Sequence, residues 1–581
     1  MATALETASL VMVPSGYEDG TLGSLQPLDG TGDFTFTRGS NISATRINED
    51  GYIEKGYENL VYYSNAFDAG TIYWDVRLIN SIIGGQAGYD GSNDAWRLNR
   101  VAGGEFIRSG SSSNVTSVSG VHTCSIYAKA NEVEWIVFGY NGIGLKYYHL
   151  SGDGSLGNNV ASVLSASIES VGNGWYRCSL TGNGTPNGIY LYPANGNGDL
   201  GGTGGVYIQD AMLNQGLVAY PYLETTTTTA KGGILEDMPR LDYSGGRCSL
   251  LLEPSRTNII GYSEYRGGGY NVSVEDNSTL SPEGVSNGCL FIENTALNSH
   301  GIQLTSQIPI NASPVDYTVS VFAKAKEREE IQLAFYADST SYNSNSFNIV
   351  NGTTDGDPNT HKIENYGNGW YRCSFTANVL NSTGGYNLVR FMMFNNSTNY
   401  YTGDGTSGLY MWGLQLEAGS YPTSYIPTYG VSQTRLSDEC VVAGITSLIG
   451  QTEGTLFFDI KDITNLYAYL GVDNGTTGTR IIMYSLNDGK IHGQVRKDGN
   501  VIFTNASSVL NGRAKAAVAF NGSESVFYVN GTQVATGNGT TYTNLSNFTF
   551  NHSNPRGAEI NQSLLFKTRL SDEACIELTT I

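Results

Sequence analysis

An internal repeat constrains the fold of this chain more than any other feature of its sequence. The segment VHTCSIYAKA, which begins at Val121, matches DYTVSVFAKA, which begins at Asp316. The segment GNGWYRCSLT from Gly172 matches GNGWYRCSFT from Gly367, and both pairs are separated by the same 195 residues. A constant offset across otherwise divergent sequence indicates two duplicated domains.

The repeated segments have the periodicity of β-strands. Residues 125–129 and 320–324 alternate apolar with polar or small side chains, as half-buried strands do. A Gly-Asn-Gly turn precedes Trp175 and Trp370, and the residues after each tryptophan alternate between two faces. We therefore predict that each copy is a β-sandwich.

Trp175 and Trp370 have two interpretations. They can be platforms on which a sugar ring stacks, or packing anchors beside a tight turn. Both copies keep nearly the same decapeptide around the tryptophan, whereas their flanking loops differ. Because function varies mainly in loops while scaffold residues are kept, we expect packing anchors.

The repeat also sets the expected domain boundaries. The first module is expected at 57–224 and the second at 256–428. A leader or attachment segment, 1–56, precedes them, and a linker with a connecting strand, 225–255, separates them. The remaining residues, 429–581, are expected to form a further domain, since the chain is too long for one core.

The C-terminal domain carries strand and hairpin signals of its own. Residues 456–460 predict a strand, and Asn530-Gly531 is a strong signal for a two-residue hairpin turn. Ser571, followed by two acidic residues, predicts the start of a short helix. The 73 Gly and 38 Tyr of the chain are typical of many short strands joined by tight turns. We predict an all-β protein.

Several long motifs resemble surface proteins of bacteriophage particles. GTLFFDI, AVAFNGSESVFYVNGTQVA and LLFKTRLSDEACIEL, from the last domain, resemble the concanavalin-A-like, laminin-G-type lectin domains of phage tail and virion proteins. Three further motifs resemble the same group: DFTFTRGSNISATRINEDGYIE from Asp33, PRLDYSGGRCSLLLEPSRTNIIGYSE from Pro239, and GLQLEAGSYPTSYIPT from Gly413.

The resemblance implies a fold, a location and partners. The two modules are expected to be carbohydrate-binding jelly rolls, followed by a concanavalin-A-like sandwich. The protein is expected on the virion surface after assembly in the host cytoplasm, as a tail fibre, a receptor-binding protein or a capsid decoration. Its expected partners are other virion proteins, host cell-surface polysaccharide and further copies of itself, a trimer by analogy.

Charge and composition disfavour several other partners. The formal net charge of −21 repels phosphates, so we expect no nucleic acid. The opening residues lack the basic region of a signal peptide, and the sequence has no apolar run near the roughly 18 residues of a membrane span. The seven cysteines are odd in number and form no Cys-x-x-Cys pair. We therefore expect buried free thiols and no membrane insertion.

The sequence contains no catalytic constellation, so we predict that the protein is not an enzyme and has no catalytic residues. No two histidines have zinc-helix spacing, and Gly201-Gly-Thr-Gly-Gly is expected to be a loop and not a phosphate-binding turn. Asp50 and Asp488 lie in predicted turns, which explains an aspartate there without catalysis. The histidines are His122, His149, His300, His361, His492 and His552.

The binding residues are not identified by the sequence. We expect no cofactor, although calcium is a candidate structural ligand because many loops offer Asp and Asn oxygens. No Asp-x-Asp-x-Asp-Gly loop is present to place a metal. Trp96, Tyr400 and Tyr401 are candidates for stacking on sugar rings, and a core or interface role accounts equally well for each.

Three functional hypotheses remain open. The first is a virion structural protein of tail-fibre or receptor-binding type that binds host-surface glycans without cleaving them, with many copies raising the avidity. The alternative is a capsid or tail decoration or adaptor with a purely structural role. A glycan depolymerase is disfavoured, since such enzymes usually present two acids on a β-helix whose short repeats are not seen here.

Overall fold

The computed structural model describes most of the chain. The described residues are 4–581 except 40–42, 71–72, 78–80, 101–105, 110–114, 141–142, 162, 202, 265–267, 306, 339, 385–386, 397, 463–468, 487, 511 and 551–556. They divide into two compact units. Unit 1 combines 1–55, 234–256 and 434–581, and unit 2 combines 56–233 and 257–433.

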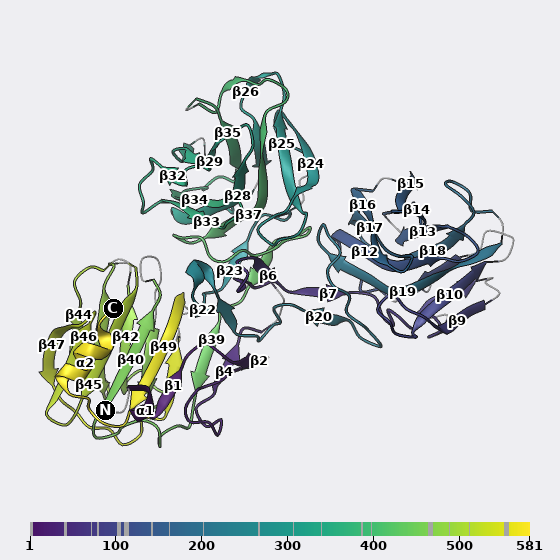
Figure 1. Cartoon of the computed structure of the whole chain (residues 1–581). Helices are drawn as coiled ribbons and strands as arrows, with labels where there is room; N and C mark the ends of the chain where they lie inside the picture. Colours follow the sequence, from purple (N-terminus) through teal and green to yellow (C-terminus); the bar gives the residue numbers. More distant parts are fainter. Residues whose placement is uncertain are drawn as a thin grey trace. The chain divides into compact units, whose positions relative to one another are not determined.

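The prediction of an all-β protein is confirmed (Figure 1). Antiparallel sheets build both units, and the two repeats are separate β-sandwich modules within unit 2. The helical segments of the described residues are short: α1 (Ala4–Thr7), α2 (Asp572–Thr579) and one turn of 3₁₀-helix (Ser244–Gly246).

Module 1 packs two sheets against each other. The first sheet has the order β16-β17-β12-β19-β10-β9, and the second has the order β15-β14-β13-β18-β11-β8. The bounds are β7 (Tyr57–Asn59), β8 (Trp74–Arg77), β9 (Ser81–Gln86), β10 (Ala95–Arg100), β11 (Phe106–Ser109), β12 (Gly120–Ala130), β13 (Trp135–Tyr140), β14 (Gly144–His149), β15 (Ser155–Asn159), β16 (Ser165–Gly172), β17 (Trp175–Gly184), β18 (Ile189–Ala194), β19 (Gly204–Gln215) and β20 (Ala230–Gly232).

Module 2 repeats this arrangement. Its first sheet, β33-β34-β28-β37-β25-β24, has the same strand order as that of module 1, and its second sheet runs β27-β35-β29-β31-β32 with β30 beside β29. The bounds are β23 (Arg256–Asn258), β24 (Val272–Thr279), β25 (Gly288–Glu293), β26 (Leu297–Asn298), β27 (Gly301–Thr305), β28 (Val315–Ala325), β29 (Glu330–Ala337), β30 (Thr340–Asn343), β31 (Phe347–Asn348), β32 (Thr353–Thr354), β33 (His361–Asn365), β34 (Trp370–Val379), β35 (Leu388–Phe394), β36 (Tyr401–Thr402), β37 (Gly408–Ala418) and β38 (Gln433–Arg435).

A buried asparagine fixes the same corner in both modules. The Asn59 side-chain amide donates to the carbonyls of Ala211 and Leu223 and accepts from two backbone N–H groups. Asn258 donates in the same way to the carbonyls of Leu414 and Ile426. Both asparagines are 0% exposed, so each satisfies backbone groups that water cannot reach.

The two repeated tryptophans are packing residues. Trp175 and Trp370 lie directly across the strand pair from Lys129 and Lys324, at equivalent positions of the two modules. Each is 1% exposed, and the indole of Trp370 donates to the carbonyl of Leu280. Neither indole therefore presents an open face to a sugar.

A segment after the last strand lies over the outer face of the first sheet in each module. In module 1 the Thr123 hydroxyl donates to the Gly216 carbonyl, and the Arg177 guanidinium donates to the Tyr220 carbonyl. In module 2 the Thr318 hydroxyl donates to the Gly419 carbonyl over 2.8 Å. The motif that ends each module thus covers part of this face with its own chain.

Unit 1 is a third sandwich, assembled from three separate parts of the sequence. One sheet has the order β21-β22-β49-β40-β45-β46-β47 with β1 beside β49, and the other has the order β2-β3-β4-β39-β48-β41-β42-β43-β44. The bounds are β1 (Leu10–Met12), β2 (Tyr17–Glu18), β3 (Thr21–Leu22), β4 (Phe34–Thr37), β5 (Thr45–Ile47), β6 (Ile53–Lys55), β21 (Arg240–Asp242), β22 (Ser249–Leu252), β39 (Glu439–Val442), β40 (Gly454–Ile460), β41 (Tyr469–Asp473), β42 (Arg480–Ser485), β43 (Ile491–Lys497), β44 (Asn500–Ala506), β45 (Ala514–Phe520), β46 (Glu524–Val529), β47 (Thr532–Asn538), β48 (Asn547–Phe550) and β49 (Ala558–Phe566).

The segment expected from the sequence to be a leader, 1–56, contributes strands to this sandwich. Leu10 pairs with Leu565 in β49, and Phe36 pairs with Cys440 in β39. The segment expected to be a linker, 225–255, contributes β21 and β22. The physical reason is burial: the apolar residues of these short strands enter the core that the C-terminal strands leave open.

Buried charges join the three parts of unit 1. Asp438 lies 3.1 Å from a guanidinium nitrogen of Arg38 and also contacts the guanidinium of Arg240. Glu253 lies 2.7 Å from Arg240 and 3.0 Å from Arg435. The side chains of these residues are at most 6% exposed. We call these five residues the unit 1 clasp, because removal of one charge leaves its partners buried without neutralisation.

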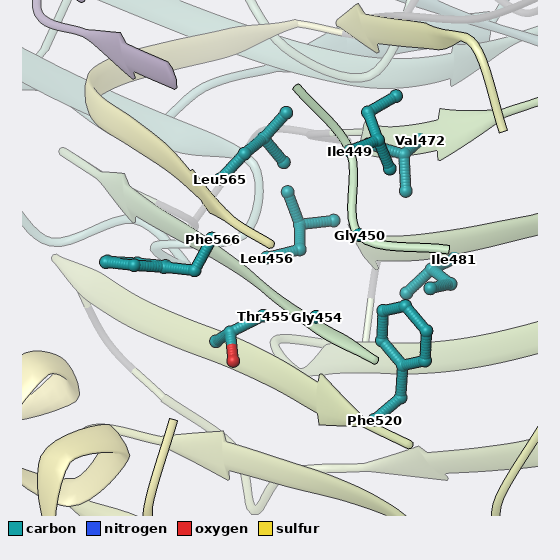
Figure 2. Close-up of a pocket in the computed structure, with 10 residues that line it drawn as sticks. All are labelled: Ile449, Gly450, Gly454, Thr455, Leu456, Val472, Ile481, Phe520, Leu565 and Phe566. Carbon is teal, nitrogen blue, oxygen red and sulfur yellow. The ribbon is translucent and has the colours of Figure 1, made fainter. Parts of the chain in front are cut away.

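The core of unit 1 contains a small cavity (Figure 2). Its volume is about 10 Å³, the space of about one water. The lining is almost entirely apolar, and it comes from both sheets: Ile449, Gly450, Gly454, Thr455, Leu456, Val472, Ile481, Phe520, Leu565 and Phe566. The cavity is therefore a packing gap, too small for a sugar.

The local signals in the C-terminal domain are confirmed. Asn530 and Gly531, with φ of 48° and 75°, form the turn between β46 and β47. The Ser571 hydroxyl caps α2 by accepting from the N–H of Ala574. These positions carry turn and cap chemistry that depends on neighbouring residues alone.

The seven cysteines all lie in described parts of the chain, and all are free thiols. Six are buried, and burial raises the pKa of each of the five thiols Cys124, Cys178, Cys373, Cys440 and Cys575.

Thiol titration without reductant is expected to give at most one reactive group, Cys248, in the native protein and seven after denaturation. The reason is that a buried protonated thiol is a poor nucleophile. A count of five or fewer in denaturant, measured with a thiol reagent, contradicts the assignment.

Candidate functional site

The outer face of the second sheet of module 1 carries a cluster of aromatic rings outside the main core. Strands β14, β13 and β18 lie side by side there (Figure 1). In β13, Trp135 is paired with His149 of β14, and Val137 is paired with Tyr147 of the same strand. On its other side, Val137 is paired with Tyr192 of β18. Because side chains alternate along a strand, these residues share one face. They are separate from the core that lies between the sheets.

The rings of this face are arranged in parallel pairs. The centroids of Trp135 and His149 are 4.5 Å apart with an interplanar angle of 18°. Those of Tyr190 and Tyr192 are 6.2 Å apart with an angle of 9°. Tyr147 is buried and forms the floor, whereas these four rings are partly exposed. We call Trp135, Tyr147, His149, Tyr190 and Tyr192 the module 1 platform.

Polar groups surround the platform. A carboxylate oxygen of Glu134 lies 3.2 Å from the imidazole of His149. The exposed amides of Asn158 and Asn197 contact each other, and the N–H of Asn158 donates to the Asn197 side chain over 2.7 Å. These groups offer both donors and acceptors at the edge of an apolar surface.

Burial sets the electrostatics of the platform. Desolvation, and then the nearby charge of Asp199, raise the pKa of Tyr147 above its usual value. Tyr147 is therefore a neutral phenol at physiological pH.

The arrangement suits the binding of a sugar ring. One face of a pyranose is lined by C–H groups, which pack against aromatic rings, while its hydroxyls need hydrogen bonds at the edge. Parallel rings with surrounding amides and a carboxylate provide both kinds of contact.

The three aromatic residues singled out in the sequence lie elsewhere. The Trp96 indole donates to the Asn65 carbonyl, and its ring packs against the core of module 1 beside Phe67. Tyr401 is buried and donates to Glu293 over 2.8 Å. Tyr400 is 57% exposed and lies in module 2, away from the platform.

The histidines do not assemble into a metal site in the described chain. Among the described residues no group of three or more His, Cys, Asp and Glu side chains is placed to hold a metal ion. Burial lowers the pKa of His122 to about 4, so it is neutral at physiological pH. His552 lies outside the described residues, as does Gly202 of the glycine-rich string. Structural calcium stays a prediction.

The platform residues were not among the candidates identified from the sequence. Their signal is a difference between the copies: the register places Tyr190 and Tyr192 opposite Gly139 and Val137, where module 2 has Arg390 and Met392 opposite Ala334 and Gln332. Aromatic residues at alternate positions in only one copy of a repeat indicate function and not scaffold.

In the described part of the chain, no helix is long and apolar enough to cross a membrane.

Among the comparisons with known proteins, matches come from solved structures. No protein-family model and no curated protein matches the chain. The CBM40 module of the Ruminococcus gnavus IT-sialidase, solved with α2,3-sialyllactose, is 20% identical, with 22% of this chain and 84% of that module covered and a TM-score of 0.20.

Two further solved structures show weaker likeness. The heptameric SAP-like pentraxin of Limulus polyphemus is 13% identical, with 22% of this chain and 69% of that chain covered and a TM-score of 0.18. Mouse laminin α1 domains LG4-5 are 11% identical, with 48% and 85% covered and a TM-score of 0.14. Likeness at these TM-scores carries no argument about the function of this chain.

Proposed function

We propose that this protein is a bacteriophage virion structural protein, of tail-fibre or receptor-binding type, that binds host-surface glycans without cleaving them. The phage assignment rests on the motifs that begin at Asp33, Pro239 and Gly413. Its location is then the virion surface, after assembly in the host cytoplasm. Its partners are other virion proteins, host polysaccharide and further copies of the chain, a trimer by analogy.

The module 1 platform is the single observation that carries the binding function. It places partly exposed rings on an outer sheet face, with amides and a carboxylate at its edge. The segment that ends each module occupies part of the first-sheet face, whereas the platform rings of the second-sheet face are partly exposed. A shallow surface buries little area, and each site is therefore weak. Many copies on one particle raise the avidity.

Retention of the full chain on immobilised glycans tests this function. Trp135→Ala combined with Tyr192→Ala is expected to weaken retention on neutral polysaccharides by about tenfold or more, which is about 1.4 kcal/mol. The reason is the loss of two ring faces on which the sugar packs. The panel consists of purified bacterial capsular polysaccharides and lipopolysaccharides, and release of reducing ends is assayed in parallel.

The control variant is Tyr484→Ala. Tyr484 stacks on His492 in unit 1, with centroids 5.0 Å apart, and so resembles the Trp135–His149 pair without belonging to the platform. It is expected to leave retention unchanged. Unchanged retention of the platform variant, or no retention of the unaltered protein on any glycan, contradicts the proposal, and released reducing ends establish a depolymerase.

A further inference from the structure

The second sheet of module 2 has a polar face at the position of the module 1 platform. Gln332 is paired with Met392, and Ala334 is paired with Arg390. The equivalent pairs in module 1 are Val137 with Tyr192 and Gly139 with Tyr190. Gln303 continues the row on the next strand, opposite Arg390. The duplication thus kept the sheet and replaced the side chains on its outer face.

Arg390 is held in one orientation on this face. Its Nε donates to the Gln303 side chain over 2.9 Å, and a terminal nitrogen donates to the Tyr336 hydroxyl over 3.2 Å. The guanidinium carbon lies 4.5 Å from the centre of the Tyr336 ring, close enough for a cation–π interaction. All three side chains are partly exposed. The guanidinium is therefore ordered before any ligand arrives.

The partners of Arg390 are neutral. Among the described residues no carboxylate lies within ion-pair distance of its guanidinium, and its hydrogen bonds go to an amide and a phenol. By contrast, Arg328 in the same module makes a two-point ion pair with Glu293. In a chain with 53 acidic and 32 basic residues, a cation held without a carboxylate is available to an external anion.

Neutral hydrogen-bonding groups flank the guanidinium. Ala334 separates Arg390 from Asn343 in the same cross-strand row. The Asn399 amide donates to the Gln332 side chain over 2.6 Å, and the Gln332 amide donates to the Ser344 carbonyl. These amides are suited to the hydroxyls of a sugar.

We propose that this face, defined by Gln303, Gln332, Tyr336, Arg390 and Asn399, binds a carboxylate-bearing sugar of a bacterial polysaccharide. The proposal rests on the glycan-binding function proposed above and extends it to a second site with a different ligand class. A guanidinium matches a carboxylate through paired N–H donors, and a charged hydrogen bond is stronger than a neutral one. The net charge of −21 repels polyanions, so recognition of the acid depends on this local cation.

The test uses the full chain and two probes, an oligogalacturonate and its methyl ester, which lacks the charge. The unaltered protein is expected to bind the acid at least tenfold more tightly than the ester. Arg390→Gln is expected to abolish this difference, and Arg390→Lys to restore part of it. The control is Arg480→Gln in unit 1, since Arg480 also donates to a glutamine, Gln494, and is outside the face. It is expected to change nothing.

Each other outcome is decisive. Equal binding of acid and ester by the unaltered protein, or unchanged acid binding by Arg390→Gln with an unchanged melting temperature, overturns the proposal. Equally strong binding of glycerol phosphate shows a general anion site and overturns the sugar-acid assignment. The platform variant keeps the two proposals distinguishable. If it loses binding to neutral glycans and still prefers the acid to the ester, the two sites bind independently. A failure of the test at Arg390 then leaves the proposed function of the platform standing.

Discussion

Asp438→Asn is expected to destabilise unit 1 by about 3–5 kcal/mol, because it removes one negative charge from the buried clasp. Asp438 is 0% exposed, contacts the guanidinium groups of Arg38 and Arg240, and accepts from the N–H of Glu253 over 2.8 Å. Without its charge, two buried guanidinium groups lose their shared counter-ion. The side-chain shape is kept, so a packing defect does not account for the loss.

Local unfolding measures this effect in unit 1. Hydrogen–deuterium exchange of peptides from β4, β21 and β39, followed through a urea series, reports on the strands that contain or adjoin Arg38, Arg240 and Asp438. The control is Glu524→Gln in the partly exposed pair with Arg569, where the expected loss is below about 1 kcal/mol. Losses of equal size in the two variants contradict the role assigned to the clasp.

Asp210→Asn is expected to stabilise module 1 at neutral pH by up to about 4 kcal/mol. Burial, and then the charges of Asp94 and Asp90, raise the pKa of Asp210 to about 7, although the Tyr89 hydroxyl donates to it over 3.0 Å. Its φ of 59° is also in the left-handed region, where the equivalent residue of module 2 is Gly413 with φ of 62°. The folded module therefore favours the protonated form of Asp210, whose backbone has a conformation that suits glycine.

The sign of the pH dependence follows from the raised pKa. Below pH 4 the carboxyl is protonated in both the folded and the unfolded chain, so no penalty exists. As the pH rises from about 4 to about 7, the unfolded chain releases the proton and the folded module does not, which costs roughly 1.4 kcal/mol per pH unit. The free energy of unfolding of module 1 therefore falls as the pH rises through this window. Above about pH 7 Asp210 causes no further loss of stability.

Scanning calorimetry between pH 4 and 8 checks the prediction. Asp210→Asn is expected to match the unaltered protein at pH 4 and to melt higher at pH 7.5. The control, Asp153→Asn, changes an exposed aspartate of the same module and is expected to have no effect. A variant with the same pH dependence as the unaltered protein means that Asp210 is ionised in the folded module.

The sequence predicted the β-sandwich modules because their determinants are local and repeated. The Gly-Asn-Gly turn, the alternation after Trp175 and Trp370, and the Ser571 cap each depend on a few neighbouring residues. The duplication then supplied a second, independent copy of the pattern. Turns, strand alternation and helix caps of this kind can therefore be predicted from the local sequence pattern.

The origin of unit 1 was not predictable in the same way. Its N-terminal strands are short, and β1 pairs with β49 more than 500 residues further along the chain, as Leu10 and Leu565 show. A strand of three residues carries almost no periodicity, so its partner is determined by tertiary burial and not by local pattern. The clasp has the same cause, since Arg38, Arg240 and Asp438 meet only after the parts assemble.

The candidate site escaped prediction for a related reason. The sequence does not show whether a tryptophan in a strand faces the core or the outside of the sheet. Trp96 packs against the core of module 1, whereas Trp135 lies on an outer face. The face depends on strand register, which the sequence alone leaves open. Comparison of the two copies, position by position in register, is the signal that identifies the platform and Arg390.

A glycan array probed with three full-length proteins tests the central claim, that the two modules bind glycans through the outer faces of their second sheets. The proteins are the unaltered chain, the Trp135→Ala and Tyr192→Ala double variant, and Arg390→Gln. We expect the double variant to lose binding to neutral glycans and to keep binding to carboxylate-bearing ones, and we expect Arg390→Gln to do the reverse. Identical binding patterns for all three proteins, or no binding by the unaltered chain, contradict it.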